Sequence, residues 1–424
     1  LCQHGQSVIV WDDSPSPRLL KKLNQSYPQV EFICGQNSVL PLSKVKQFIV
    51  SPGVELKKIQ ARLDPLGLKE WMGDIELFLQ HASSPIIAVT GSNGKTTVVT
   101  LIGKMIQAAG FTVEVCGNIG EPVLSTLKRP NPDFIVMELS SFQLELIDNL
   151  SATVAVLLNV EPDHMDRYQH FNDYLSAKKK IYMGCDYAVV NRDQAHYFNN
   201  IEPKISRLEF TVSKQASAMF SIKQRQDEAY LYCEETSLMP VTEMQLQGQH
   251  HWQNALVLFA VAKALGLPDA SVRSVLQSFE GLEHRCQLVN DCNGVRWFND
   301  SKATNVAATC AAIYALSHQI KGRLILIMGG DAKGADFTPL KDLMTTHVDH
   351  VIFFGVDAEK IEAAFCNIVQ LTAVDSLEEA VKYANCIAMT NDTVALSPAC
   401  SSLDMFDNFE HRGDLFARYV SGLK

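Results

Sequence analysis

The chain has 424 residues, 47% of them hydrophobic, which suits about two to four domains with apolar cores. With 37 Lys and Arg against 47 Asp and Glu, its net charge of −10 makes it a poor candidate for binding nucleic acid. No apolar run reaches the roughly 18 residues of a membrane span, so we expect no membrane partner, and 11 cysteines without a CxxC pair favour reduced thiols in a cytoplasm.

Short apolar, β-rich runs alternate with segments of helical periodicity along the whole chain. We predict strands at Ser7–Trp11, Gln47–Val50, Ile86–Val89, Phe134–Met137, Val154–Leu158, Tyr187–Val190, Leu324–Met328, Val351–Phe354 and Thr393–Leu396. Most of these runs are continuous rather than alternating, which is typical of parallel strands buried on both faces. Between them, Thr96–Ala109 has one apolar face and ends before Gly110, so it predicts an amphipathic helix. The chain is therefore expected to be α/β, with doubly wound, mainly parallel sheets.

The first predicted strand, Ser7–Trp11, is followed by Asp12 and Asp13, which resembles the second strand of a Rossmann-like half. In such a half a first strand and its glycine-rich turn come earlier and take roughly 20–30 residues with their helix. Only a short stretch precedes Ser7, so we expect the first domain to lack its first strand. Motif order places domain boundaries near Gly73 and Gly281, and the polar alternation between Pro203 and Pro240 predicts an antiparallel edge of the second sheet.

The strongest local signal is Thr90–Thr97, which reads TGSNGKTT between the strand Ile86–Val89 and the helix that follows. Backbone N–H groups of such a loop, together with the helix N-terminus, cradle phosphate oxygens. Lys95 would reach the outer phosphates of a nucleotide, and Thr96 would offer its hydroxyl to Mg²⁺. The general phosphate-loop pattern begins with a glycine where this chain has Val89, so a plain strand-to-helix turn is the alternative.

Polar side chains follow the next two predicted strands. Glu138 comes directly after Phe134–Met137, and Asn159, Glu161, Asp163 and His164 come after Val154–Leu158. Ligands gather at the carboxyl ends of strands in α/β sheets, so a carboxylate and an imidazole there could hold Mg²⁺. Taken alone, however, His164 is more often an ordinary surface histidine. The run of lysines from Lys178 to Lys180 favours a solvated helix face on composition alone.

Three strand ends in the last part of the chain carry small polar or cationic groups. They are Asp300–Asn305, Gly329–Gly334 and Ser397–Ser402. Helix caps and plain turns explain such residues equally well. Taken together, however, they indicate an anionic substrate at this end of the last sheet.

From about Gln47 onward the chain resembles the Mur ligase family. The matching stretches read TGSNGKTT, ELSSFQLE, NVEPDHMDRY, GLEHR, NDSKATN, GGDAKGADF and SPACSSLDMFDNFEHRGDLF, and they follow the family's order. The family's phosphate loop reads TGxNGKT, so Val89 is no departure within it. The last three stretches resemble the branch of the family that adds D-glutamate, rather than the branches that add L-alanine or a diamino acid.

The resemblance implies three domains: a UDP-binding Rossmann-like domain over residues 1–73, a central ATPase domain over 74–281 and a C-terminal dinucleotide-fold domain over 282–424. It implies an ADP-forming ligase that joins D-glutamate to UDP-N-acetylmuramoyl-L-alanine through an acyl phosphate. That reaction belongs to peptidoglycan precursor synthesis, with ATP and Mg²⁺ required. We expect the ligase to act as a monomer in the cytoplasm.

The resemblance also implies roles for individual residues. Residues expected at ATP are Gly91, Ser92, Asn93, Gly94, Lys95, Thr96, Thr97, Asn254, Arg285 and Asp300. Residues expected at the two other substrates are Gly53, Asn118, Ser140, Lys302, Thr304, Lys333, Ser402, Leu403 and Phe409. Residues expected to act in catalysis or to hold the metal are Lys95, Thr96, Glu138, His164 and Lys178. Lys178 resembles the lysine that the family carbamylates with CO₂, which replaces the interpretation of a solvated face.

The chain departs from the family pattern at two places. His251 stands where the family has an Asn that would touch adenine, within the stretch GQHHWQN that ends at Asn254. The glycine-rich first strand of the UDP-binding domain is missing. We therefore expect weak binding of the UDP substrate by this chain and intact binding of ATP.

Two other functions remain open at this point. A folylpolyglutamate synthase has the same TGxNGK loop and also joins glutamate to a carboxylate, although the stretch SPACSSLDMF argues against it. A non-enzymatic ATP-sensing module is the second alternative, and it would have little need for Asp300–Asn305 and Lys333 beside an intact loop. A substrate panel would decide the first question, and an assay of ADP release the second.

Overall fold

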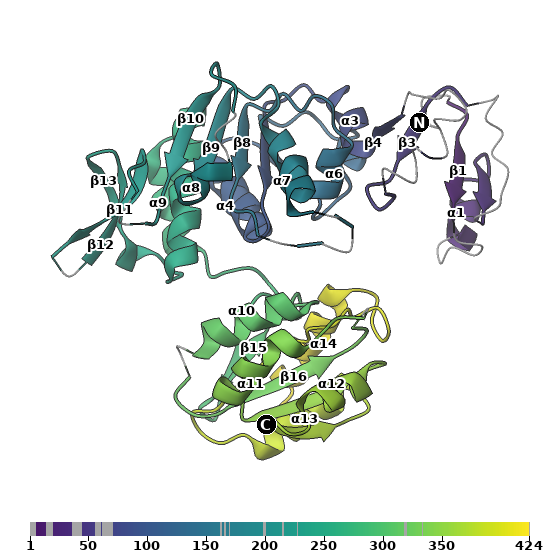
Figure 1. Ribbon diagram of the computed structural model, residues 1–424, viewed down its shortest axis with the longest axis vertical. Helices are drawn as coiled ribbons and strands as arrows, with labels where there is room; N and C mark the ends of the chain where they lie inside the picture. The colour runs from purple at the N-terminus through teal and green to yellow at the C-terminus, as the bar shows by residue number, and fades with distance from the viewer. Residues whose placement is uncertain are drawn as a thin grey trace. The chain divides into compact units, whose positions relative to one another are not determined.

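The computed structural model describes residues 6–13, 20–35, 45–55, 61, 71–161, 163–164, 167–168, 170–197, 201–213, 216–226, 228–317, 320–332 and 334–423 (Figure 1). It separates into two compact units. The first unit comprises Leu1–Glu243 and Gly248–Val275, and the second unit comprises Met244–Gln247 and Leu276–Lys424.

The first unit begins with two small parallel sheets, each of two strands. One pairs β1 (Ile9–Asp12) with β2 (Glu31–Cys34) beside the helix α1 (Leu20–Ser26), and the other pairs β3 (Phe48–Val50) with β4 (Trp71–Gly73). The predicted strands at the start of the chain are confirmed, while β2 and β4 escaped prediction because their runs are short.

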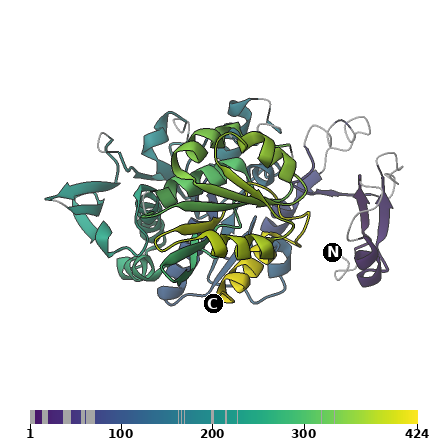
Figure 2. The same cartoon turned by 90° about the horizontal axis from the view of Figure 1, so that it is seen from below.

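A nine-stranded sheet follows in the order β13-β12-β11-β10-β9-β8-β5-β7-β6. Its strands are β5 (Ile86–Thr90), β6 (Val113–Gly117), β7 (Phe134–Glu138), β8 (Val154–Leu157), β9 (Tyr187–Asn191), β10 (Ser206–Phe210), β11 (Phe220–Arg225), β12 (Glu228–Cys233) and β13 (Thr236–Pro240). The strands from β6 to β11 run parallel, and β12 and β13 form an antiparallel edge (teal in Figures 1 and 2). The predicted antiparallel edge is right for β12 and β13, but β10 and β11 belong to the parallel part.

Helices cover both faces of this sheet because its central strands are apolar on both sides. Every residue of β5 and β8 is buried, as their continuous patterns predict. The predicted amphipathic helix is α4 (Lys95–Ala108), which packs on β6, β7 and α8 (Gln249–Leu265). The other helical elements of the unit are α3 (Asp74–Leu79), α5 (Val123–Thr126), α6 (Ser141–Glu145), α7 (Phe171–Lys179), η4 (Lys180–Tyr182), η5 (Arg192–Tyr197), η6 (Val241–Glu243) and the larger part of α9 (Asp269–Ser278), whose last residues belong to the second unit.

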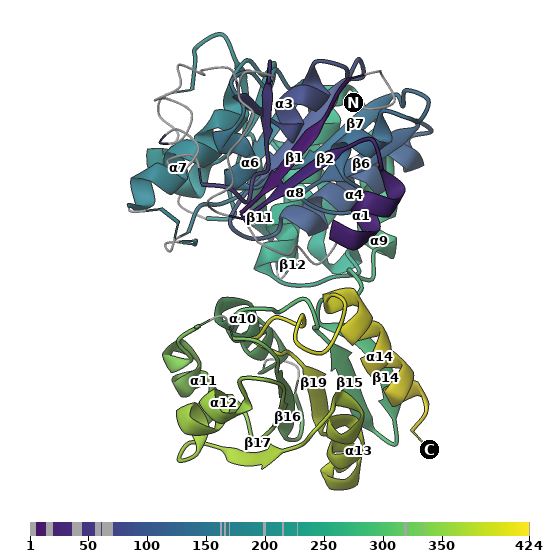
Figure 3. The same cartoon turned by 90° about the vertical axis from the view of Figure 1, so that its right-hand side faces the viewer.

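The second unit is a six-stranded sheet in the order β14-β15-β19-β16-β17-β18. Its strands are β14 (Gln287–Cys292), β15 (Val295–Asn299), β16 (Leu324–Gly329), β17 (His350–Phe354), β18 (Gln370–Ala373) and β19 (Thr393–Leu396), and only β14 runs antiparallel to its neighbour. One apolar cluster packs α10 (Val306–Ser317), α11 (Lys341–His347) and α12 (Ala358–Phe365) on one face, near η7 (Thr338–Leu340). The opposite face carries α13 (Leu377–Ile387) and α14 (Phe409–Ser421), as Figure 3 shows.

These sheets confirm the predicted α/β class with mainly parallel strands. The nine-stranded sheet starts after Gly73, and the longer segment of the second unit starts at Leu276, where boundaries were expected near Gly73 and Gly281. The three domain ranges themselves stay a prediction. Within the part of the chain that the structure describes, no helix combines the length and apolar character needed to cross a membrane.

The sharpest backbone constraint in the second unit lies at Gly329, the last residue of β16. Its φ is +132°, and a Cβ there would lie 1.9 Å from the carbonyl oxygen of Phe354 on the neighbouring strand β17. No L side chain fits unless the two strands separate.

We therefore expect Gly329→Ala to destabilise the protein by at least about 2 kcal/mol, since backbone strain and steric overlap add. The matched control is Gly281→Ala, because Gly281 has a φ of +110° with nothing within 4 Å of its ideal Cβ. That change should cost only about 1 kcal/mol. Scanning calorimetry on both variants measures this, and equal shifts in Tm would contradict the steric account.

Candidate functional site

The phosphate-loop candidate lies at the centre of the nine-stranded sheet. Strand β5 pairs with β7 on one side and β8 on the other, so the carboxyl ends of all three meet at the loop Gly91–Gly94. Gly94, with φ +81°, is the N-cap of α4, whose N-terminus therefore opens into this loop. Backbone N–H groups and a helix N-terminus at a strand end suit a phosphate.

The loop is braced by the segment that follows β8. Asn159 holds the backbone of Asn93 from both sides: the Asn93 N–H donates to Asn159 Oδ1 at 2.8 Å, and Asn159 Nδ2 donates to the Asn93 carbonyl at 3.1 Å. The Ser92 hydroxyl accepts from the Glu161 N–H at 2.9 Å and lies 3.0 Å from the hydroxyl of Tyr174. None of these bracing residues was predicted to shape the loop, because their pairing depends on the spatial neighbourhood of β5 and β8.

Two lysines meet at the same loop. Lys95 Nζ donates to the carbonyl oxygens of Gly91 and Ser92, at 2.8 Å and 3.0 Å. Lys178 Nζ, from α7, donates to the Gly91 carbonyl at 2.8 Å and lies 4.8 Å from the ring centroid of Tyr174. The Lys178 side chain is only 2% exposed, so the interpretation of a solvated face is wrong for this residue.

Burial and, to a smaller extent, the positive charge of Lys95 together lower the pKa of Lys178 to about 7, against the opposing effect of Asp163 and Glu138. A buried amine with that pKa is partly neutral near neutral pH. A neutral lysine amine is a nucleophile, whereas the usual ammonium is not.

Glu138, at the end of β7, presents a buried carboxylate oxygen beside these lysines. Asn118 Nδ2 donates to Glu138 Oε1 at 2.9 Å, but Oε2 is buried and has no hydrogen-bond partner among the described residues. Gly117 lets β6 approach closely, since a Cβ there would lie 2.2 Å from the Glu138 carbonyl oxygen. A buried carboxylate oxygen without a donor is the arrangement a bound cation would complete.

His164 lies in the segment after β8, with its ring 4.8 Å from that of Phe142 and its Nε2 3.6 Å from Asp163 Oδ2. Its side chain is 48% exposed. Among the described residues, no group of three or more His, Cys, Asp or Glu side chains could hold a metal ion by itself. A metal here would need further ligands, such as nucleotide phosphates.

The other predicted residues of the first unit lie near the loop or in neighbouring turns. The side-chain oxygen Oδ1 of Asn254 lies 3.5 Å from the ideal Cβ position of Gly94, so Asn254 lies against the loop. Burial, with a smaller effect of His250, lowers the pKa of His251 to about 4, so a neutral imidazole replaces the expected Asn. Ser140 caps α6 in a capping box with Gln143, and Gly53 lies in the turn after β3.

In the second unit the carboxyl ends of β15, β19 and β16 lie side by side. Asp300 follows β15 and is buried. Its carboxylate accepts from the hydroxyl of Ser397, which follows β19, at 2.8 Å, and from the Cys286 N–H at 3.2 Å. Burial outweighs these bonds and raises the pKa of Asp300 to about 6.

The residues expected at D-glutamate gather around the same strand ends. Lys302 Nζ lies 5.4 Å from the ring centroid of Phe409, and the Thr304 N–H donates to the Lys302 carbonyl. Ser402 is buried and Leu403 is exposed in the turn after β19. Arg285 is exposed near Asp300, whose pKa it lowers. Lys333 lies outside the described residues.

Arg412, on α14, joins these strand ends and was missed as a site residue in the sequence. It is fully buried, and its guanidinium donates to the carbonyl oxygens of Gly329, Cys400 and Ser301 and to the Ser301 hydroxyl, at 2.9–3.2 Å. Burial lowers its pKa to about 10. A single Arg in a helix that looks exposed does not reveal its burial. The one sequence signal for Arg412 was its place in the stretch SPACSSLDMFDNFEHRGDLF.

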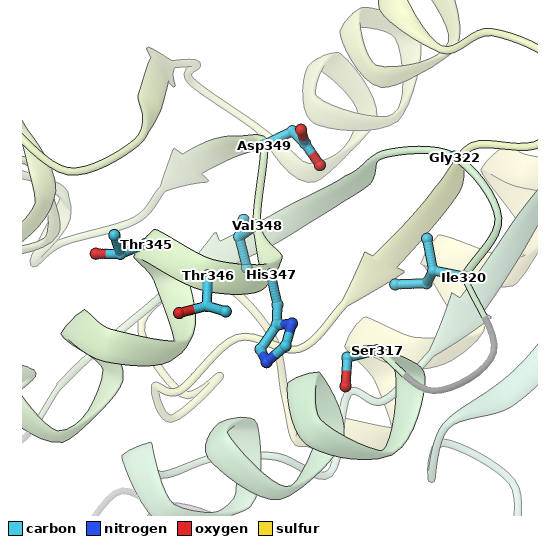
Figure 4. A pocket seen from close by; sticks show the side chains of 8 residues that line it. All are labelled: Ser317, Ile320, Gly322, Thr345, Thr346, His347, Val348 and Asp349. Atoms are coloured by element: carbon cyan, nitrogen blue, oxygen red, sulfur yellow. The ribbon is translucent and has the colours of Figure 1, made fainter.

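The hollow in Figure 4 lies at the opposite end of the second unit's sheet. It has a volume of about 280 Å³ and is lined by Ser317, Ile320, Gly322, Thr345, Thr346, His347, Val348 and Asp349. These residues precede β16 and β17 or end α10 and α11, so the hollow lies at the amino ends of the strands. Ligands of α/β sheets bind at the carboxyl ends, and the hollow contains no predicted site residue.

Comparisons with known proteins agree with this geometry. The family model of the Mur ligase middle domain matches residues 89–262, and that of the Mur ligase, glutamate ligase domain matches residues 284–400. UDP-N-acetylmuramoylalanine--D-glutamate ligases from Coxiella burnetii and Pseudomonas fluorescens are each 43% identical over 423 residues. These matches cover 100% of this chain and 95% and 94% of the two relatives.

Solved structures show the same fold at lower identity. A pseudomurein peptide ligase type C from Methanothermus fervidus matches with a TM-score of 0.63 at 17% identity, over 100% of this chain and 96% of its own. The UDP-N-acetylmuramate-alanine ligase MurC from Thermotoga maritima matches with a TM-score of 0.61 at 17% identity, over 99% and 100%. At these identities the likeness concerns the fold alone.

The buried guanidinium of Arg412 predicts a large stability loss on truncation. Arg412→Met leaves several buried carbonyl oxygens without a donor, so we expect a loss of about 3 kcal/mol in the free energy of unfolding. Arg418→Met, on the exposed side of the same helix, should stay within about 0.5 kcal/mol of the wild type. If calorimetry showed that the two variants unfold at the same temperature, the contacts of Arg412 with the buried carbonyl oxygens would not stabilise the protein as proposed.

Proposed function

The chain belongs to the Mur ligase family, and from that premise we propose that it joins D-glutamate to UDP-N-acetylmuramoyl-L-alanine at the expense of ATP, in peptidoglycan precursor synthesis. This reaction is assigned to the site at the phosphate loop of the first unit. The observation that carries it is the meeting of the phosphate loop, Lys95, Lys178 and the unpartnered oxygen of Glu138 at one sheet edge.

ATP fits the central loop by charge and geometry. Lys95 would leave the carbonyl oxygens of its own loop for the outer phosphates, which are stronger acceptors because they are charged. Backbone N–H groups of Gly91–Gly94 and the N-terminus of α4 would hold the remaining phosphate oxygens. We assign Asn254, from the first unit, and Arg285 and Asp300, from the second unit, to contacts with the adenosine and ribose of ATP.

Mg²⁺ fits the residues beside the loop. Glu138 Oε2 would be one ligand, Thr96 would offer its hydroxyl, and His164 is a further candidate. When bound, Mg²⁺ would neutralise charge that develops on the transferred phosphoryl group. Lys178 would be a further ligand once its neutral amine has added to CO₂, because the amine then becomes an anionic carbamate and releases one proton.

The reaction needs activation because a free carboxylate is a poor electrophile. The L-alanyl carboxylate would take the γ-phosphoryl group of ATP and become an acyl phosphate, with Lys95 stabilising the charge that spreads over the transferred oxygens. The amine of D-glutamate would then attack the acyl carbon and expel phosphate. Asn118, Ser140 and His164 are assigned to the muramoyl end of the substrate, and Gly53 to its uracil.

The second unit would bind D-glutamate. Its two carboxylates need cations and several donors, which Lys302, Lys333, Thr304 and Ser402 would supply, while Leu403 and Phe409 would shape the pocket. We propose that the enzyme works as a monomer in the cytoplasm, where its nucleotide substrates are found, with neither nucleic acid nor membrane as partner. A folate as acceptor is disfavoured, since the 43% identity to D-glutamate-adding ligases extends over 423 residues.

The direct test is an ADP-release assay with each substrate omitted in turn. We expect sustained release only when UDP-N-acetylmuramoyl-L-alanine, D-glutamate and ATP are all present, because the carboxylate is needed to form the acyl phosphate and the amine is needed to consume it and free the enzyme for the next turnover. Replacement of D-glutamate by L-glutamate, or of the muramoyl substrate by a folate, should reduce the rate at least about 100-fold. Equal rates with either replacement would rule the assignment out.

The lowered pKa of Lys178 predicts that activity depends on both CO₂ and pH. Since its pKa is about 7, the amine is mostly neutral above pH 7 and becomes an ammonium that cannot add CO₂ as the pH falls below 7. Removal of CO₂ should therefore lower kcat at least about 10-fold, with the loss growing below pH 7 and reversed by bicarbonate.

Carbon-13 bicarbonate gives a direct readout of the same modification. The wild type and the control Lys179→Ala should both show a carbamate resonance, whereas Lys178→Ala should show none. A carbamate that survives in Lys178→Ala, or CO₂-independent activity in the wild type, would refute the assignment of this lysine.

A further inference from the structure

Arg167 joins two parts of the first unit that lie far apart in the sequence. It follows His164 in the segment after β8, and its Nη1 donates to the carbonyl oxygen of Pro52 at 2.9 Å. Its Nη2 donates to the carbonyl oxygen of Val54 at 3.3 Å and to Glu145 Oε2, on α6, at 2.7 Å. One guanidinium thus connects the turn after β3, the helix α6 and the segment after β8.

The guanidinium of Arg167 is shielded from water and stacked on an aromatic ring. The Arg167 side chain is 10% exposed and that of Glu145 is 15% exposed, so their ion pair is largely shielded from water. The guanidinium carbon lies 4.1 Å from the ring centroid of Phe142, which is a favourable stacking distance. A shielded, stacked arginine with three hydrogen-bond acceptors holds its orientation far better than an exposed ion pair does.

The same elements contact His164 directly. The Arg167 N–H donates to the carbonyl oxygen of His164 at 3.0 Å, so the two residues share one turn. Phe142 contacts both of them, with the Arg167 guanidinium stacked on its ring and the His164 ring centroid 4.8 Å away. The position of His164 is therefore linked to that of Arg167 through both the backbone and the Phe142 ring.

The other end of the connection is the turn after β3. Its backbone closes through the Val54 N–H, which donates to the Ser51 carbonyl at 3.0 Å, and Gly53 lies at its tip. Arg167 binds carbonyl oxygens on both sides of Gly53 and no side chain of the turn. It therefore ties the turn to the segment after β8 through the backbone of the turn.

We propose that Arg167 is a positioning residue that holds the nucleotide-binding turn around Gly53 in register with the segment carrying Asp163 and His164. The inference rests on the proposed function, in which the UDP end of one substrate lies at Gly53 and its carboxylate end at His164. Arg167 touches neither end. It sets the distance between the two places where a single long substrate must be held, which is what productive orientation requires.

This role differs from simple stabilisation in its kinetic signature. Without Arg167, binding of the UDP substrate no longer presents its carboxylate at the phosphate loop, so the KM for that substrate rises and kcat falls. ATP binds at Gly91–Thr97, which Arg167 does not contact, so the KM for ATP stays unchanged. A purely structural residue would instead lower the amount of folded enzyme and leave every KM unchanged.

The test compares Arg167→Ala, Arg167→Lys and Glu145→Gln with the control Arg129→Ala, an arginine of the same unit that pairs with Glu114 and Glu121 at the surface. Arg167→Ala should raise the KM for UDP-N-acetylmuramoyl-L-alanine at least about 10-fold with the KM for ATP within about twofold of wild type. Arg167→Lys should not restore it, because an ammonium cannot reach three acceptors in one plane. Glu145→Gln should give a weaker change in the same direction, and Arg129→Ala none.

A second measurement is independent of catalysis. Amide hydrogen exchange of residues 48–55 should be faster in Arg167→Ala than in wild type and unchanged in Arg129→Ala, since the turn loses two carbonyl contacts. An unchanged exchange rate, or a KM for ATP that rises as much as that for the UDP substrate, would overturn the inference. A wild type that releases ADP without the UDP substrate would instead overturn the proposed function and leave the exchange result to decide on Arg167.

Discussion

Burial of charge at the carboxyl end of β5 is the constraint on which the rest of the first unit depends. Lys95 and Lys178 both donate to the carbonyl oxygen of Gly91, and Glu138 brings a carboxylate oxygen without a donor to the same place. Buried charges are costly unless they are paired and hydrogen-bonded. A phosphate chain between the lysines and a cation at Glu138 would complete this arrangement, which explains why the protein keeps it.

The surrounding structure holds that end of the sheet rigid. Asn159 clasps the backbone of Asn93, Gly117 lets β6 close against Glu138, and α4 begins where the loop ends. The second unit uses the same principle with a different device. There the buried guanidinium of Arg412 gathers the carbonyl oxygens at the ends of three strands, so backbone dipoles rather than carboxylates satisfy its charge.

The sequence predicted the central strands and the loop because continuous apolar runs and the TGSNGKTT stretch carry their own local signal. It failed where burial is decided by packing between distant segments. Composition alone gave Lys178 a solvated face, yet α7 places it at the loop, and only the family resemblance, not composition, separated it from Lys179. The strand β6 was missed because its run is short and mixed, and Arg167 was missed because two of its three guanidinium hydrogen-bond partners, Pro52 and Val54, lie more than 100 residues away in the chain.

We propose above all that nucleotide and metal meet at Glu138 and the loop after β5. Crystals grown with Mn²⁺ and a non-hydrolysable ATP analogue would test this most directly, since Mn²⁺ gives an anomalous signal. The account predicts a peak at about 2 Å from Glu138 Oε2, with Lys95 Nζ moved from the Gly91 carbonyl to a phosphate oxygen. A peak remote from Glu138, with Lys95 still bound to its own loop, would contradict it.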